Sequence, residues 1–158
     1  MTGAGRLLGV DYGTVRVGLA VSDAGRVIAS PLTTYTRRGR DADALYLRAL
    51  ADREEVGAVV VGLPVHGDGR EGVKAREARA FGAWLAEATG RPVVFWDERY
   101  TTVEAEQRLI DAGLKRQKRK ALRDQLAAQI MLQSYLDAGC PETEAPAAPL
   151  ADPPETNP

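Results

Sequence analysis

Residues 7–23 have the sequence LLGVDYGTVRVGLAVSD. The apolar run 7–10 is closed by Asp11 and Gly13, which predicts a buried strand that ends at Asp11. Residues 15–21 alternate between bulky apolar residues and small or charged ones, the pattern of a second strand. Asp11 is therefore expected on a rigid hairpin, although Asp also begins many turns for purely structural reasons.

The length of 158 residues is that of one domain with a single core. No apolar run approaches the roughly 20 residues that cross a bilayer, and the first six residues lack the apolar stretch of a signal peptide. The single cysteine, Cys140, excludes a disulfide framework and a cysteine metal site within one chain. We therefore expect a soluble, cytoplasmic protein without a membrane partner.

Charge is distributed unevenly along the chain. The net charge is −1, which by itself argues against a general nucleic-acid binder. Four acidic residues, six of the nine prolines and no basic residue lie from Cys140 onward, which leaves residues 1–139 with a net charge of +3. This end has few bulky apolar residues to bury. We expect a folded domain at residues 1–139 and a disordered acidic, Pro-rich tail at residues 140–158.

Beyond the hairpin, strands alternate with helices. Pro31 lies within one expected strand and indicates an edge strand or a bulge. Apolar runs predict strands at 27–35, 58–64 and 93–98, and helical spacing predicts helices at 41–56, 73–89, 101–112 and 120–137. This order predicts an α/β fold with a mixed five-stranded sheet, which begins as an antiparallel hairpin, continues with parallel strands and has helices on both faces.

Glu98 is the first of two further carboxylates of interest. It follows an apolar strand and shares a strand face with Val94 and Trp96. A carboxylate in this position is costly to bury unless it meets a cation. An ion pair with neighbouring Arg99 is the simpler explanation, and the residues alone leave both open.

Asp124 lies in the last expected helix, on the same side as Ala127 and Ala128. Small side chains let this side of the helix approach a sheet closely. Asp124 therefore borders the buried side of the helix. The alternative is a surface Asp that pairs with Lys120 or Arg123.

Two carboxylates at strand ends and one on a helix describe a site made only of oxygen ligands. Such a site prefers Mg²⁺ or Mn²⁺ to Zn²⁺. Two such ions about 4 Å apart can activate a water molecule and stabilise the leaving oxygen of a phosphodiester. His66, the one histidine, is interpreted as a loop residue and not as a ligand.

Four blocks of the sequence resemble the motifs of the YqgF/RuvX family. They are DYG at 11–13 with RVGLA at 16–20, VGLP at 61–64 with DG at 68–69, DER at 97–99 with TT at 101–102, and Lys120 with Asp124 and AA at 127–128. The resemblance implies a ribonuclease H-like fold, a nuclease that processes the 5′ end of precursor 16S ribosomal RNA, and similarity to Holliday junction resolvases. It also implies that Asp11, Glu98 and Asp124 are catalytic and bind one or two metal ions.

Basic residues near the expected site predict contacts with nucleic acid. Such a run is often only a solvated segment, but each phosphate that it neutralises adds salt-dependent, sequence-tolerant binding. The run is expected to be a loop up to the helix at 120. Its residues, with one a turn later, are Lys115, Arg116, Lys118, Arg119, Lys120 and Arg123. Arg16 and Arg99 either orient the scissile phosphate or balance the carboxylates when metal is absent.

Several functions stay open at this level. Structured RNA is the first candidate substrate and branched DNA the second. Symmetric cutting of a four-way junction needs two active sites, which a homodimer has and a monomer lacks. Both oligomeric states stay open. Residues 11–14 also resemble a phosphate-binding segment of actin-like kinases, but the chain has one domain and no P-loop sequence. A non-catalytic RNA-binding module in ribosome assembly is the remaining alternative.

Overall fold

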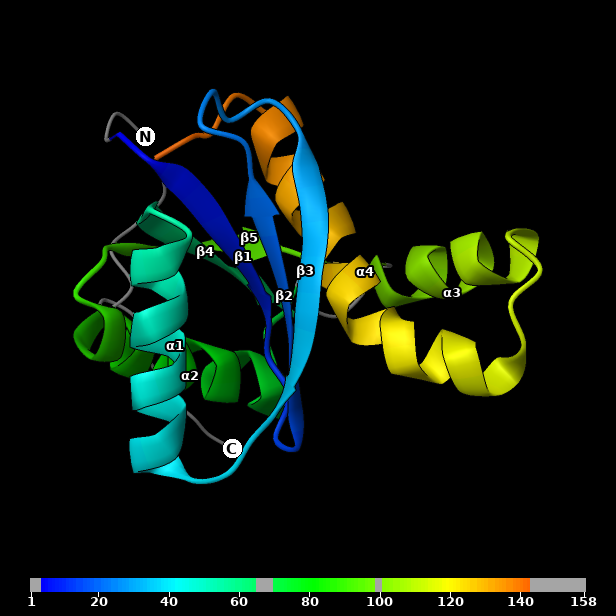
Figure 1. Cartoon of the computed structure of the whole chain (residues 1–158), viewed down its shortest axis with the longest axis horizontal. Coiled ribbons are helices and arrows are strands. Elements are labelled where there is room, and N and C mark those ends of the chain that lie inside the picture. The colour runs from blue at the N-terminus through cyan, green and yellow to red at the C-terminus, as the bar shows by residue number, and fades with distance from the viewer. Residues whose placement is uncertain (1–3, 65–69, 99–100, 143–158) are drawn as a thin grey trace.

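The computed structural model describes residues 4–64, 70–98 and 101–142, without the side chains of residues 101–103 and 120–121 (Figure 1). His66, Arg99 and residues 143–158 of the expected tail lie outside this part. The elements in chain order are β1 (Arg6–Asp11), β2 (Arg16–Ser22), β3 (Ala29–Thr36), α1 (Arg40–Arg53), β4 (Val56–Leu63), α2 (Val73–Thr89), β5 (Val93–Asp97), α3 (Thr101–Asp111) and α4 (Arg116–Asp137).

The five strands form one mixed sheet in the order β3-β2-β1-β4-β5. β2 pairs antiparallel with both β1 and β3, whereas β4 runs parallel to β1 and β5 runs parallel to β4. This confirms the predicted ribonuclease H-like arrangement of an antiparallel start followed by parallel strands. β1 and β4 are central and buried on both faces, as their continuous apolar sequences predict.

Helices cover both faces of the sheet, as expected (Figure 1). α1 and α2 pack on one face, where Leu8 and Val10 of β1 join Leu47 and Phe81 in one cluster. α4 packs on the other face, where Leu7 contributes to a second cluster with residues of α4. The alternation of strand side chains thus assigns each residue of β1 to one helical layer.

β3 is an edge strand, and Pro31 lies beside a shift in its pairing with β2 between Leu19 and Ala20. Both features that Pro31 predicted are therefore present. An edge position suits proline because its missing N–H leaves no interior ladder bond unmade. None of the described helices is both long enough and apolar enough to cross a membrane.

The prediction that the basic run is a loop up to residue 120 is wrong, because α4 already begins at Arg116. Lys115 is extended and forms the N-cap, and Arg119 donates its N–H to the Lys115 carbonyl. Arg, Gln and Lys are good helix formers, so residues 116–119 continue the helix without an apolar face of their own. α3 and the first turns of α4 lie side by side and project beyond the sheet (Figure 1).

Candidate active site

Asp11 is the last residue of β1 and points toward α4. Side chains along a strand alternate between the two faces. A Cβ on Gly9, two residues earlier, would meet the Leu132 side chain of α4, so Asp11 projects from this same face. β1 thereby ends at Asp11, as the sequence predicted, and holds the carboxylate at the edge of the core beneath α4.

Glu98 directly follows β5, and its N–H donates to the Leu63 carbonyl at 3.2 Å. Its side chain lies over Gly62 of β4, since a Cβ on Gly62 would overlap Glu98 Oε1 and lie 3.3 Å from Met131 Cγ of α4. Gly62 therefore creates the space that the carboxyl group fills between sheet and helix. Oε1 is buried and has no hydrogen-bond partner within the described residues.

Asp11 and Glu98 form a hydrogen-bonded carboxyl pair. Burial is the main cause and repulsion from the Asp11 charge the second, and together with smaller contributions they raise the pKa of Glu98 to about 9. Burial also raises the pKa of Asp11 to about 6, with Asp124 adding repulsion while the bond from Glu98 opposes the shift. The pair therefore retains one proton at neutral pH, which the two carboxyl groups share.

Asp124 reaches this pair because Gly18 lets α4 approach β2. Gly18 is opposite Asp11 in the β1–β2 register, and a Cβ on Gly18 would overlap the Asp124 carbonyl. The Asp124 carboxylate accepts a hydrogen bond from Arg16 Nε at 3.0 Å and lies 3.8 Å from Arg123 Nε. Asp124 is thus largely shielded from solvent, and Arg123 is the more distant of the two cations that contact it among the described side chains.

The three carboxylates converge from β1, the end of β5 and α4. In the conformation described, no group of three His, Cys, Asp or Glu side chains among the described residues is arranged to hold a metal ion. The donor set still fits a hard divalent cation. It consists of carboxylate oxygens only, one buried oxygen has no partner among the described residues, and the pair keeps a proton where a cation would otherwise balance its charge.

The described basic side chains divide into three sets. Arg16 and Arg123 lie at the carboxylates, as described above. Lys115, Arg116 and Lys118 are exposed near the start of α4, and Arg116 is about 12 Å along the helix axis from Asp124. Arg119 instead donates to Glu106 of α3 at 2.8 Å. The Lys120 side chain and Arg99 lie outside the described residues.

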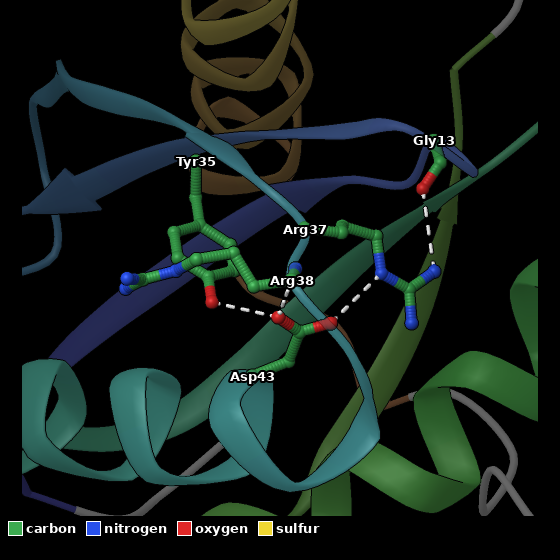
Figure 2. A network of polar contacts seen from close by, with 5 residues as sticks. All are labelled: Gly13, Tyr35, Arg37, Arg38 and Asp43. Atoms are coloured by element: carbon green, nitrogen blue, oxygen red, sulfur yellow. Dashed lines mark hydrogen bonds and ion pairs between the residues drawn. The ribbon is translucent and has the colours of Figure 1, made fainter.

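Sequence patterns gave no indication of a polar network that braces the turn after Asp11 (Figure 2). Asp43 of α1 is 1% exposed and accepts hydrogen bonds from the Tyr35 hydroxyl, Arg37 Nε and the Arg38 N–H. Burial alone would raise the pKa of Asp43, but these three donors hold it below its usual value. Arg37 also contacts the Gly13 carbonyl at 3.5 Å, which ties α1 to the β1–β2 turn.

A family model described as "RuvX: Holliday junction resolvase" matches residues 5–138. The chain belongs to the RuvX family. The match ends before Cys140, so it lies within residues 1–139, where one folded domain is expected, and includes none of the residues 140–158 of the expected tail. It also spans all three carboxylates and the basic start of α4, so the candidate site lies wholly within the RuvX match.

Curated relatives of this RuvX chain carry the name "Putative pre-16S rRNA nuclease". One from Rhodopirellula baltica is 46% identical over 85% of this chain and 78% of its own length, and one from Myxococcus xanthus is 43% identical over 86% and 90%. Among solved structures, T. thermophilus RuvC in complex with a Holliday junction substrate matches with a TM-score of 0.54 and 20% identity, over 85% of this chain and 95% of the other. This likeness confirms the ribonuclease H-like fold.

Proposed function

We propose that this RuvX protein is a divalent-metal-dependent nuclease that hydrolyses phosphodiester bonds in structured RNA, in the 5′-end processing of precursor 16S ribosomal RNA. The substrate is inferred from the name that relatives with 42–46% identity carry. The chemistry is inferred from one observation above all. Asp11 and Glu98 share a buried site beside Asp124, and like charges are placed this close only where a proton or a cation balances them.

In this proposal, Asp11, Glu98 and Asp124 hold one or two Mg²⁺ or Mn²⁺ ions. A bound ion supplies a water of lowered pKa and stabilises negative charge on the phosphate. The chain supplies the rest. Glu98 releases its proton to solvent when a cation takes over the charge balance, and Gly62 keeps the space that its carboxylate needs.

Arg16 positions the scissile phosphate. Its Nε is bonded to Asp124, so the planar guanidinium has a fixed direction and its remaining N–H groups can donate to phosphate oxygens. The exposed cations at the start of α4 neutralise phosphates farther along the substrate. The site thus separates bond cleavage at the sheet from backbone binding at the projecting helices.

The test is cleavage of a precursor 16S RNA fragment with Mg²⁺, with Mn²⁺ and with EDTA. Asp11→Asn and Asp124→Asn should lose activity by at least two orders of magnitude, because each removes a charge that the ion requires. Asp137→Asn, on the exposed side of the same α4, is the matched control and should remain active. Equal activity of Asp11→Asn and wild type, or full activity in EDTA, would contradict the proposal.

A second candidate is cleavage of four-way DNA junctions, which the description of the matching family favours. The same carboxylates would act, and only the substrate differs. Symmetric cutting requires two active sites, so the oligomeric state of the protein with the junction is measured in the same experiment. Cleavage of the junction at rates that exceed those on RNA would favour this candidate over the first.

A further inference from the structure

A pocket of about 310 Å³ lies on the face of the sheet opposite the carboxylates, at the same end of β1. Tyr12 contributes from the residue after β1, and the other residues come from the segment after β3, from α1 and from α2. The lining residues are Tyr12, Arg37, Arg40, Glu77, Ala80, Phe81 and Trp84. This volume is at the lower end of the range of small-molecule sites, about 300 to 1,000 Å³.

Three aromatic rings form a continuous wall of this pocket. The rings of Tyr12 and Phe81 are 4.8 Å apart between centroids, and those of Phe81 and Trp84 are 5.3 Å apart. The Arg37 guanidinium lies 5.2 Å from the centroid of the Phe81 ring and 5.9 Å from that of Tyr12. Phe81 is buried and supports the other two rings, so the partly exposed Tyr12 and Trp84 are the rings on which a flat aromatic ligand can stack without sequence-specific hydrogen bonds.

The cations of the pocket differ in how they are held. Asp43 fixes Arg37 through the network of Figure 2, so this guanidinium is a rigid part of the wall. Arg40 is exposed, and no ion pair with it occurs in the part of the chain that the structure describes. Glu77 provides a carboxylate acceptor. Stacking rings, an acceptor and an available cation together suit a nucleobase that carries an amino group and an adjoining phosphate.

The pocket and the proposed catalytic site are built on adjacent residues of the chain. Tyr12 follows Asp11, so their Cα atoms are about 3.8 Å apart while their side chains turn to opposite faces of the sheet. A strand with its phosphate at Asp11 can pass around this end of the sheet to Tyr12, because the two residues are adjacent in the chain. The base of a neighbouring nucleotide can enter the pocket only if it is unpaired, because a base within a duplex is stacked and paired.

We propose that this pocket binds one unpaired nucleotide of the substrate next to the bond that is cleaved. The inference rests on the proposed nuclease function and adds to it a preference for sites where a duplex meets a single strand. Such a pocket would let RuvX select the cleavage position by structure and not by base sequence.

The test measures binding of a fluorescent single-stranded hexanucleotide RNA and of a blunt RNA duplex, in EDTA so that cleavage does not interfere. Trp84→Ala should weaken binding of the single strand about 5- to 150-fold, the range for losing one base–aromatic stack, and leave duplex binding unchanged. Trp84→Phe keeps an aromatic ring and should bind nearly as wild type. Equal weakening for both RNAs in Trp84→Ala would overturn the proposal.

Arg40→Ala tests the phosphate contact without touching the core. It should reduce the slope of log affinity against log salt by about 0.7, the value for one phosphate of a single strand. Arg48→Ala removes an exposed cation from the same helix outside the pocket and is the matched control. An unchanged slope in Arg40→Ala, or equal losses in both variants, would contradict the assignment.

Tryptophan fluorescence gives a direct readout, because the sequence contains only Trp84 and Trp96. In Trp96→Phe, the hexanucleotide should quench the remaining Trp84 emission. Quenching by adenosine monophosphate alone, with no preference for the hexanucleotide, would show a free-nucleotide site and overturn the substrate assignment. If Asp11→Asn abolishes cleavage while Trp84→Ala binds and cleaves as wild type, the pocket inference fails and the proposed function stands.

Discussion

Replacing Glu98 by Gln should remove most of the pH dependence of stability in the metal-free protein. In the folded state the pKa of Glu98 is raised from 4.5 to about 9, so between these values the folded protein holds a proton that the unfolded chain releases. A group of this kind stabilises the fold most at low pH, and the contribution is lost as pH rises through that window. A glutamine side chain at this position does not titrate and has no such window.

The size of the effect follows from one proton. Each pH unit within the window changes the free energy of unfolding by about 1.4 kcal/mol, which is about 3 kcal/mol between pH 5 and pH 7. This is an upper limit for Glu98 alone, because Asp11 shares the proton. The pKa of Asp11 is itself raised to about 6, so Asp11 adds its own decline in the free energy of unfolding as the pH rises toward 6. Wild-type protein should therefore lose stability steadily from pH 5 to pH 8.

Urea denaturation in EDTA at pH 5, 6, 7 and 8 measures this for wild type and Glu98→Gln. Glu87→Gln changes an exposed glutamate of α2 and is the control, which should keep the wild-type slope. The Glu98→Gln protein should also be inactive in cleavage while more stable than wild type at pH 8. Parallel stability curves for wild type and Glu98→Gln would refute the buried carboxyl pair.

Three further changes test the neighbouring contacts. Gly62→Ala should reduce cleavage at least 10-fold but change the melting temperature little, because the new Cβ displaces only the tip of Glu98; wild-type activity would contradict this. Gly18→Ala should instead destabilise the fold by about 1–3 kcal/mol in urea, because its Cβ meets the backbone of α4, and unchanged stability would refute that close approach. Asp43→Ala should lower the free energy of unfolding by about 3–5 kcal/mol, because Arg37 loses its carboxylate partner and the Tyr35 hydroxyl loses its acceptor. A loss below about 1 kcal/mol would contradict a stabilising role for this network.

Much of the fold could be predicted because its determinants are local. α2 runs from Val73 to Thr89 as predicted, since Gly90 takes the left-handed conformation that ends a helix. β1 and β2 follow from the apolar run and the alternation in residues 7–21. α4 was predicted to begin too late because its first turn is exposed and has no apolar periodicity to detect.

The candidate site was only partly predictable. The three carboxylates could be named from strand ends, helix position and family resemblance, but the sequence does not reveal that Gly62 makes room for Glu98 or that Gly18 admits α4. These contacts join residues more than 30 positions apart. The aromatic pocket was missed for the same reason, because Tyr12 and Phe81 meet only after the sheet and α2 have packed.

The central claim is that the carboxylates of Asp11, Glu98 and Asp124 together bind divalent metal. A crystal structure of the protein soaked in Mn²⁺, with anomalous diffraction data, tests it most directly. We expect one or two manganese peaks in contact with oxygens of all three residues. An ion elsewhere, or no ion at millimolar Mn²⁺ with Asp11 and Glu98 still sharing their proton, would contradict it.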